Sequence, residues 1–229
     1  MKIISFDPQL IGTGHLFPDE IEKEYGVGYH GTASYYSEDI EAHGFLPKGN
    51  PFLPEDFEVL KYYFVKYSGD CAAVSRISSL QSISFSPLSP LCLHYVKPNM
   101  LGGQCLQDVK SLIDKVPLNE IGLDLSGVKR KISLIQSSNP VIYAVKLCMM
   151  HDKNVVFDYG TAAFHVSADI SVDKIIAKIE ISDFNDYDSI DVAKLNKIIR
   201  SVYYNDNKCY MRQLNPIEDD IDLIPLFAK

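Results

Sequence analysis

The chain contains no tryptophan, only five cysteines, and no apolar run that reaches the roughly 18 residues of a membrane-spanning helix. The cysteines are odd in number and scattered, without a Cys-x-x-Cys pair or a zinc spacing with the six histidines. This pattern predicts reduced thiols in a reducing compartment and no bound metal. The first residues, Met1 to Pro8, place an acid and a proline where a signal peptide has its apolar segment. We therefore expect a cytoplasmic protein without membrane contact.

Positive charge is also scarce. The 22 Lys and Arg residues against 30 Asp and Glu residues give a formal net charge of −8 at pH 7. An acidic surface repels phosphate backbones at long range, so contact with nucleic acid would have to rest on a local basic patch. The sole basic cluster, Lys129-Arg130-Lys131, is more typical of a solvated face than of such a patch.

What is present is typical of one folded domain. With 46% hydrophobic and 23% charged residues, the 229-residue chain can bury a substantial core, which excludes a disordered or fibrous protein. Short strands and short helices are interspersed, and no linker or internal repeat divides the chain. We expect a single α+β domain over residues 1–229, with an N-terminal arm over 1–24 and an acidic C-terminal tail over 216–229.

Local patterns predict where the elements lie. Alternating or continuous apolar residues between turn formers indicate strands, and apolar residues spaced about three to four apart indicate helices. The expected strands lie near 24–30 and at 82–86, 131–135, 140–147, 154–160 and 209–214. The expected helices lie at 37–43, 54–68, 172–179 and 190–203, and residues 105–116 fit either element. The nearly continuous apolar run at 140–147 predicts the centre of a sheet.

The most informative segment is Gly28-Tyr29-His30-Gly31-Thr32, which we expect at the end of a buried strand with a helix beside it. Such a His-Gly pair suits the nicotinamide end of NAD. Without a Cβ, the Gly31 backbone can approach a ligand closely, and His30 offers a directional hydrogen bond to a ribose hydroxyl. Taken alone, the pair fits a histidine beside a turn glycine better than it fits a ligand clamp.

A second segment supplies a family resemblance. The run Ser84-Phe85-Ser86-Pro87-Leu88-Ser89-Pro90-Leu91 resembles the aromatic-Phe-x-Pro-x-Ser-Pro-Met segment of DarT-type ADP-ribosyltransferases. The Gly102-Gly103-Gln104 that follows matches a Gly-Gly-Gln of the same family, and Tyr29-His30-Gly31-Thr32 precedes both in the family's order. Farther along, the run from Val155 to Ala163 is similar to the family's Val-Phe-Thr-Asp-Gly-His-Ala stretch.

Eukaryotic-type poly-ADP-ribose polymerases, which belong to the same superfamily, show a related resemblance. Their Gly-Ile-Tyr-Phe-Ala segment lies over residues 82–86, and their later Asn-Tyr lies over His94-Tyr95. Two tyrosines sandwich the nicotinamide ring in those enzymes, and here Tyr95 falls on the second while Ser84 falls on the first. The resemblance implies an ADP-ribosyltransferase-like split sheet flanked by short helices. It also implies that NAD, as substrate, contacts Tyr29, His30, Gly31, Thr32, Ser84, Phe85 and Tyr95.

The resemblance further implies a late glutamate that accepts a hydrogen bond from the ribose 2′-hydroxyl and helps the acceptor lose its proton. The strand expected at 209–214 carries Gln213 at that place. Glutamine can still form hydrogen bonds with the ribose but cannot act as a base. Three explanations stay open: Gln213 replaces a native glutamate to silence the enzyme, Gln213 is natural, or the working acid is Glu180 or Glu218. The implied catalytic set is Gln213, His30 and Arg76, the last as the nearest counterpart of a family arginine.

We therefore expect an NAD-dependent mono-ADP-ribosyltransferase, most like the toxin of a toxin-antitoxin or phage-defence system, with an antitoxin or chaperone as a partner. The resemblance favours a DNA or RNA base as the macromolecular acceptor. A protein acceptor is a close second because the chain is acidic. The alternative from another class is a catalytically inactive module that binds NAD or ADP-ribose, which Ser84 and Gln213 favour.

Overall fold

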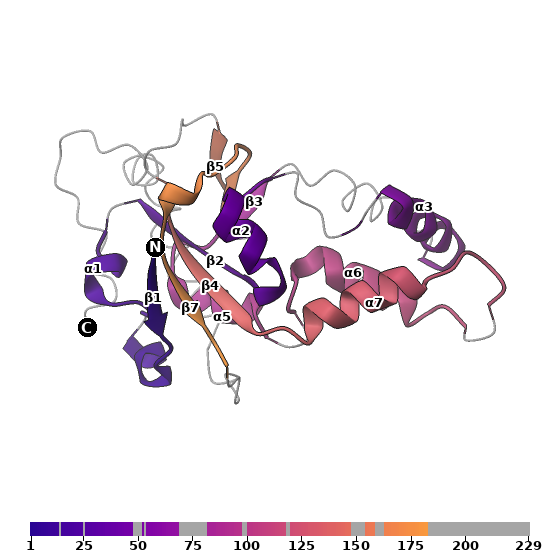
Figure 1. Ribbon diagram of the computed structural model, residues 1–229, viewed down its shortest axis with the longest axis horizontal. Helices are drawn as coiled ribbons and strands as arrows, with labels where there is room; N and C mark the ends of the chain where they lie inside the picture. Colours follow the sequence, from indigo (N-terminus) through magenta and orange to yellow (C-terminus); the bar gives the residue numbers. More distant parts are fainter. Residues whose placement is uncertain are drawn as a thin grey trace.

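Two β-sheets form the centre of the protein (Figure 1). The computed structural model describes residues 1–13, 15–24, 26–47, 52, 54–68, 82–97, 100–117, 120–147, 154–158 and 163–182. In the first sheet the strand order is β1 (Lys2–Ser5), β7 (Ile175–Glu180), β4 (Pro140–Lys146) and β2 (Val27–Ala33). Strands β1 and β7 are parallel, and the other neighbours in this sheet are antiparallel.

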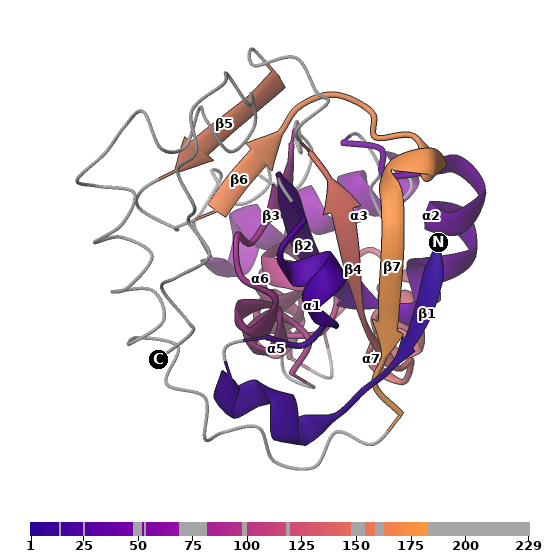
Figure 2. The same cartoon turned by 90° about the vertical axis from the view of Figure 1, so that its left-hand side faces the viewer.

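The second sheet is antiparallel, with the order β3 (Ile83–Phe85), β6 (Ala163–Val166) and β5 (Val155–Asp158). Figure 2 shows it continuing from β2, on the side away from β1. The described part of the chain is thus a mixed α and β fold with one mixed and one antiparallel sheet, which agrees with the α+β class at this level.

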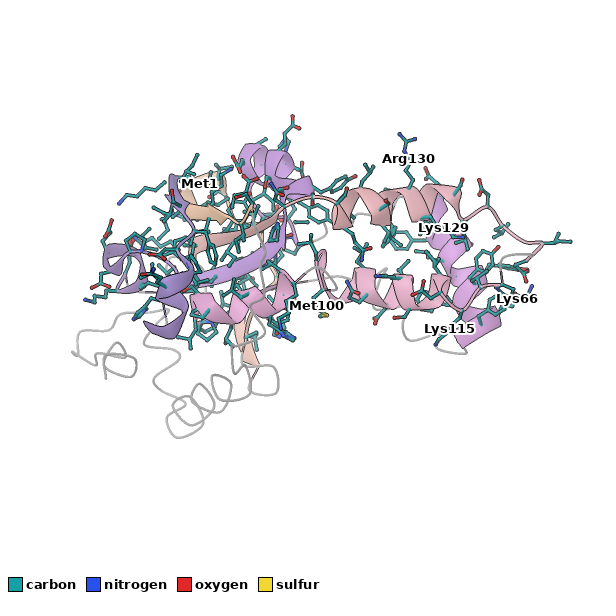
Figure 3. The ribbon with its side chains drawn as sticks, turned by 90° about the horizontal axis from the view of Figure 1, so that it is seen from below. Met1, Lys66, Met100, Lys115, Lys129 and Arg130 are labelled. Carbon is teal, nitrogen blue, oxygen red and sulfur yellow. The ribbon has the colours of Figure 1, made fainter. Side chains whose placement is uncertain are left out.

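Most helices are short. Those near the sheets are η1 (Pro8–Thr13), α1 (Asp19–Glu22), η2 (Ser34–Tyr36), α2 (Ser37–His43), η4 (Ser89–Leu91), α5 (Cys92–Tyr95) and η6 (Val172–Lys174). The helical lobe at one end of the molecule consists of α3 (Pro54–Tyr63), which continues as the π-helical turn η3 (Phe64–Ser68), α6 (Gly103–Ile113) and α7 (Ser126–Gln136). Figure 3 shows the lobe from below, with Lys129 and Arg130 on α7. None of the described helices is both long and apolar enough to cross a membrane.

Strand β4 is buried on both faces, as its continuous apolar sequence predicts. Because successive side chains of a strand point to opposite faces, Ile142 and Ala144 join the core beneath α5 and the helical lobe. Tyr143 and Val145 join a second core, which lies between the first sheet, α2 and the strands of the second sheet. The antiparallel register with β2 places His30 opposite Tyr143, so His30 lies on the face of the second core.

Several predicted elements are confirmed. Helices α2 and α3 and strands β3, β4 and β5 occupy the segments expected for them, and 105–116 is largely helical, as part of α6. The first core strand lies farther along the chain than expected, because β2 begins at Val27 and runs to Ala33, which places His30-Gly31 in mid-strand. The expected N-terminal arm contributes β1 to the sheet.

Two predicted elements are wrong. Residues 131–135 are helical, because Val128, Ile132 and Ile135 form the buried side of α7 and the alternation of polar and apolar residues ends at Leu134. The helix expected at 172–179 is the short turn η6 followed by strand β7, in which buried Ile175, Ala177 and Ile179 alternate with more exposed neighbours. The helix expected at 190–203, the strand expected at 209–214 and the tail at 216–229 lie outside the described residues.

Candidate functional site

The candidate site lies where the two sheets meet, between β2 and β3. Within the described residues, these strands share one isolated bridge. The Tyr29 N–H donates to the Ser86 carbonyl at 2.8 Å, and the Ser86 N–H donates to the Tyr29 carbonyl at 2.7 Å. Two residues farther on, regular antiparallel pairing would join Gly31 to Ser84. Instead the Ser84 carbonyl lies 2.8 Å from His30 Nδ1, so a side chain takes the place of a backbone donor. We call this point, where the backbone pairing of β2 and β3 stops at His30, Gly31 and Ser84, the split.

The imidazole of His30 is held in one orientation at the split. A carbonyl oxygen can only accept, so Nδ1 carries the proton and Nε2 of the neutral ring is left as an acceptor. The ring packs edge-on against Phe45, at 5.2 Å between centroids, and at a tilt against Phe85, at 5.4 Å. Burial lowers the pKa of His30, and the hydrogen bond to Ser84 offsets only part of this effect. At neutral pH the ring is therefore uncharged.

Gly31 is explained by helix packing. A Cβ at this position would lie 2.8 Å from Val96 Cγ1 and 2.9 Å from the Cys92 carbonyl oxygen. Helix α5 therefore fills the space that the missing side chain leaves, on the opposite face of β2 from His30. The Gly31 N–H also forms a hydrogen bond with the Cys92 thiol, whose pKa burial raises despite that bond. The sequence predicts that this glycine lets a ligand approach the backbone, which stays a prediction; on the α5 face of β2 the space beside Gly31 is occupied by the helix.

The predicted contact residues divide into buried and accessible groups. Tyr29, Thr32 and Phe85 are buried, with 2%, 8% and 0% of their surface exposed. The Tyr29 ring lies on the α5 side of β2 and stacks on Phe17 at 5.5 Å. These three side chains belong to the packed interior, whereas His30 is half-buried and Ser84 is exposed.

Tyr95 ends α5, the helix that packs on Gly31. Its side chain is 42% exposed, and its ring packs edge-on against His94 at 5.3 Å. Burial raises the pKa of Tyr95, so its hydroxyl stays protonated at neutral pH. Gln213, Arg76 and Glu218 lie outside the described residues, and Glu180 accepts a hydrogen bond from the Asn139 amide at 3.0 Å at the end of β7.

Sequence reasoning missed His165, which stands beside Ser84. The register of β3 and β6 pairs these two residues, and the Ser84 hydroxyl lies 3.0 Å from His165 Nδ1. Ser84 thus contacts two histidines, His30 through its carbonyl and His165 through its hydroxyl. Their neighbours Phe85 and Phe164 point to the core. The alternation of Ala163-Phe164-His165-Val166 is the one signal that predicts an outward histidine here.

Sequence reasoning also missed a buried carboxylate, that of Glu22, whose side chain is only 4% exposed. Its Oε1 accepts from the backbone N–H groups of Leu16 and Phe17, each at 2.9 Å, and from the Ser89 hydroxyl. Its Oε2 accepts from the Tyr29 hydroxyl at 2.7 Å. Nothing in Asp-Glu-Ile-Glu, which is typical of a solvated first helical turn, indicates this burial.

The donors around Glu22 keep it ionised. Burial would raise the pKa of this carboxyl, but the interactions with His15, Ser89, Phe17 and Tyr29 outweigh burial and hold the pKa below its usual range. His15 Nδ1 lies 3.6 Å from Glu22 Oε2, and the carboxylate raises the pKa of His15. A charged group is therefore held beneath β2, on the face opposite His30.

The split offers an uncharged imidazole acceptor and a serine hydroxyl, which suit a ligand that carries sugar hydroxyls. The exposed ring of Tyr95, which could stack on a flat ring, belongs to α5, the helix that packs on the opposite face of β2 from His30. No set of three or more His, Cys, Asp or Glu side chains in the described part of the chain is placed to hold a metal ion. Comparison of the chain with protein-family models, with curated proteins and with solved structures finds no match.

Proposed function

We propose that this protein is an NAD-dependent ADP-ribosyltransferase that binds the nicotinamide end of NAD at the split. The observation that carries the proposal is His30, fixed by Ser84 as the neutral Nδ1–H tautomer where β2 and β3 separate. Both residues lie in segments that resemble the DarT-type enzymes in sequence. The proposal includes the finer fold assignment, in which the two sheets form the split sheet of this superfamily.

The proposed reaction breaks the bond between nicotinamide and C1′ of the ribose. Positive charge develops on the ribose, nicotinamide leaves, and an acceptor nucleophile bonds to C1′ and gives up its proton. The site must hold the ribose rigidly and present an acceptor to its hydroxyls. His30 Nε2 supplies that acceptor, and the ring cannot turn away without breaking the bond to Ser84.

Tyr95 and Ser84 set how the nicotinamide ring is held. Stacking on an aromatic face contributes about 1 kcal/mol beyond area burial, and Tyr95 offers one such face. Ser84 places a hydroxyl where the resemblance implies the second ring. We therefore propose that the nicotinamide ring stacks on Tyr95 alone, and that the affinity for NAD is lower than in a site with two tyrosines.

The proposed acceptor is macromolecular. The resemblance favours a base in DNA or RNA, which would have to reach the split as a flipped or single-stranded nucleotide. The net charge of −8 favours a protein acceptor as the second choice. We propose that an antitoxin or chaperone restrains the activity in the cell.

A second candidate function is an inactive module that senses NAD or ADP-ribose. The observation that favours it is Gln213, which cannot take the acceptor's proton.

The test that separates the two functions is to incubate the chain and its Gln213→Glu variant with labelled NAD and RNA, single-stranded DNA or cell lysate. Transfer by the variant alone indicates a silenced enzyme, and transfer by both indicates that the working acid is elsewhere. NAD binding without transfer in either indicates the sensor, and absence of NAD binding rejects both functions.

The binding site itself is tested by His30→Asn. The asparagine amide nitrogen can replace Nδ1 as donor to the Ser84 carbonyl, whereas the Nε2 acceptor is lost. We expect a folded variant that binds NAD at least about tenfold more weakly by calorimetry, because a hydrogen bond to the ribose is removed. The matched control is His43→Asn, at an exposed histidine that ends α2. Unchanged NAD affinity in His30→Asn would count against the site.

A further inference from the structure

We infer that Glu22 is a positioning residue for the split, because its buried carboxylate joins β2 to the segment that directly follows β3. Tyr29 belongs to β2, and Ser89 is the first residue of η4, which follows β3 after a short turn. The two residues donate to different oxygens of the same carboxylate. His30 directly follows Tyr29 in the chain, so the carboxylate of Glu22 holds the residue next to the imidazole.

The hydrogen bonds form a closed circuit around the bridge. From Glu22 Oε2 the circuit passes through the Tyr29 side chain and backbone to the backbone of Ser86. The Ser86 hydroxyl donates to the Leu88 carbonyl at 2.8 Å and accepts from the Leu88 N–H at 3.2 Å, which fixes the turn. The next residue, Ser89, returns the circuit to Glu22 Oε1. The circuit therefore fixes both partners of the bridge, Tyr29 on β2 and Ser86 after β3, and with them the point at which the two strands separate.

The circuit is rigid because it is buried and its donors are matched. Ser89 is 0% exposed and Tyr29 is 2% exposed. The backbone N–H of Leu16 also donates to the Ser89 hydroxyl, at 2.9 Å, so the N-terminal segment is tied to the same point. A neutral amide at position 22 would place N–H groups against these donors and leave some of them unsatisfied. The separation of β2 and β3 would then relax, and with it the bond from His30 to Ser84.

The expected effect of Glu22 on NAD binding rests on the proposed function, whereas its expected effect on the His30 ring does not. A tie that fixes the split should hold the His30 ring in its Nδ1–H tautomer whether or not a ligand is bound. Both can be measured separately, the tautomer and titration of His30 by ¹⁵N NMR and the affinity for NAD by calorimetry.

The experiment compares Glu22→Gln with the matched control Glu20→Gln. Glu20 lies on the same helix, but its side chain is 63% exposed and faces Lys2 at 3.5 Å. For folded Glu22→Gln we expect His30 to titrate closer to an ordinary histidine and to populate the other tautomer, and NAD affinity to fall about tenfold or more. The Glu20→Gln variant should match the parent in both measurements.

Two milder variants keep the inference testable if Glu22→Gln does not fold. Tyr29→Phe and Ser89→Ala each remove one tie, and each should shift the His30 titration in the same direction, by less. The double variant should shift it by less than the sum, because both ties belong to one circuit. An unchanged His30 titration in Glu22→Gln, or in both single-tie variants, overturns the inference. If the parent chain binds no NAD, the proposed function fails while the His30 titration still decides the role of Glu22.

Discussion

The lowered pKa of His30 predicts how the stability of the fold depends on pH. Since the folded-state pKa of His30 is lowered, the unfolded chain binds more protons than the folded chain below about pH 6.5. The contribution of this residue to stability is thus complete above about pH 6.5 and is lost as the pH falls through the folded-state pKa. We expect an NMR titration of the ring to show a midpoint below the usual histidine range. A midpoint at or above that range would contradict the assignment of a neutral ring at this site.

Gly31 gives a prediction that concerns the fold and not the ligand. In Gly31→Ala the new methyl would press on the Cys92 carbonyl, which is backbone and cannot turn aside. We expect a loss of about 1–3 kcal/mol in the free energy of unfolding, measured by denaturant titration. The control is Gly127→Ala on α7, where the nearest atom to the new Cβ is Asp56 Oδ1 at 3.9 Å. That change should be neutral or stabilise by at most about 1 kcal/mol.

The residues of the site differ in how far the sequence predicts them. Resemblance places His30 and Ser84 in adjoining segments, but their contact joins positions 54 apart, and no local pattern fixes such a pairing. Glu22 carries no signal at all, because its burial depends on Ser89, 67 positions away. The packing of α5 gives a second reason for the glycine at position 31, and no local pattern predicts that contact. Local chemistry can thus suggest a residue, whereas its function depends on contacts made after folding.

At the scale of elements, the errors have a common cause. Val172, Ile175, Ile176 and Ile179 fit a helical stripe, yet Ile175, Ala177 and Ile179 fit strand alternation equally well. The abundance of β-branched residues in this segment favours a strand, and its pairing with β1 on one side and β4 on the other fixes it as strand β7. In α7 the reverse occurs, because only the residues from Lys131 to Leu134 alternate between polar and apolar, while the helix as a whole does not. Short segments fit both periods, and tertiary contacts select one.

The helical lobe depends on apolar contacts between α6 and α7. Leu106 of α6 is 0% exposed, and a Cβ at Gly102 would meet both Leu106 Cδ2, at 2.6 Å, and Ile135 Cγ2, at 2.8 Å. We expect Leu106→Ala to lower the free energy of unfolding by about 2–5 kcal/mol, because it leaves a cavity in this contact. The matched control is Leu134→Ala on α7, where the side chain is 48% exposed and the change should stay within about 0.5 kcal/mol. Equal losses in a denaturant titration would contradict the packing.

At the scale of the whole molecule, charge constrains how a nucleic-acid acceptor could bind. The basic cluster reduces to Lys129 and Arg130, which are exposed on α7, because Lys131 pairs with Asp56 at 2.9 Å with both side chains mostly buried. Figure 3 shows Arg130 pointing away from the lobe. Two cations on a chain of net charge −8 can neutralise few phosphates.

We therefore expect the affinity for single-stranded DNA or RNA to depend only weakly on salt. Two neutralised phosphates correspond to a slope of about −1.4 in a plot of log affinity against log salt, since each contributes about −0.7. Fluorescence anisotropy between about 50 and 200 mM salt measures this slope, and Lys129→Ala with Arg130→Ala should reduce it. Lys61→Ala on α3, at another exposed lysine, is the control. A much steeper slope would mean that a wider basic surface contacts the phosphates. If the chain binds neither DNA nor RNA, that result would favour a protein acceptor, because an acidic surface does not repel proteins in general as it repels phosphate backbones.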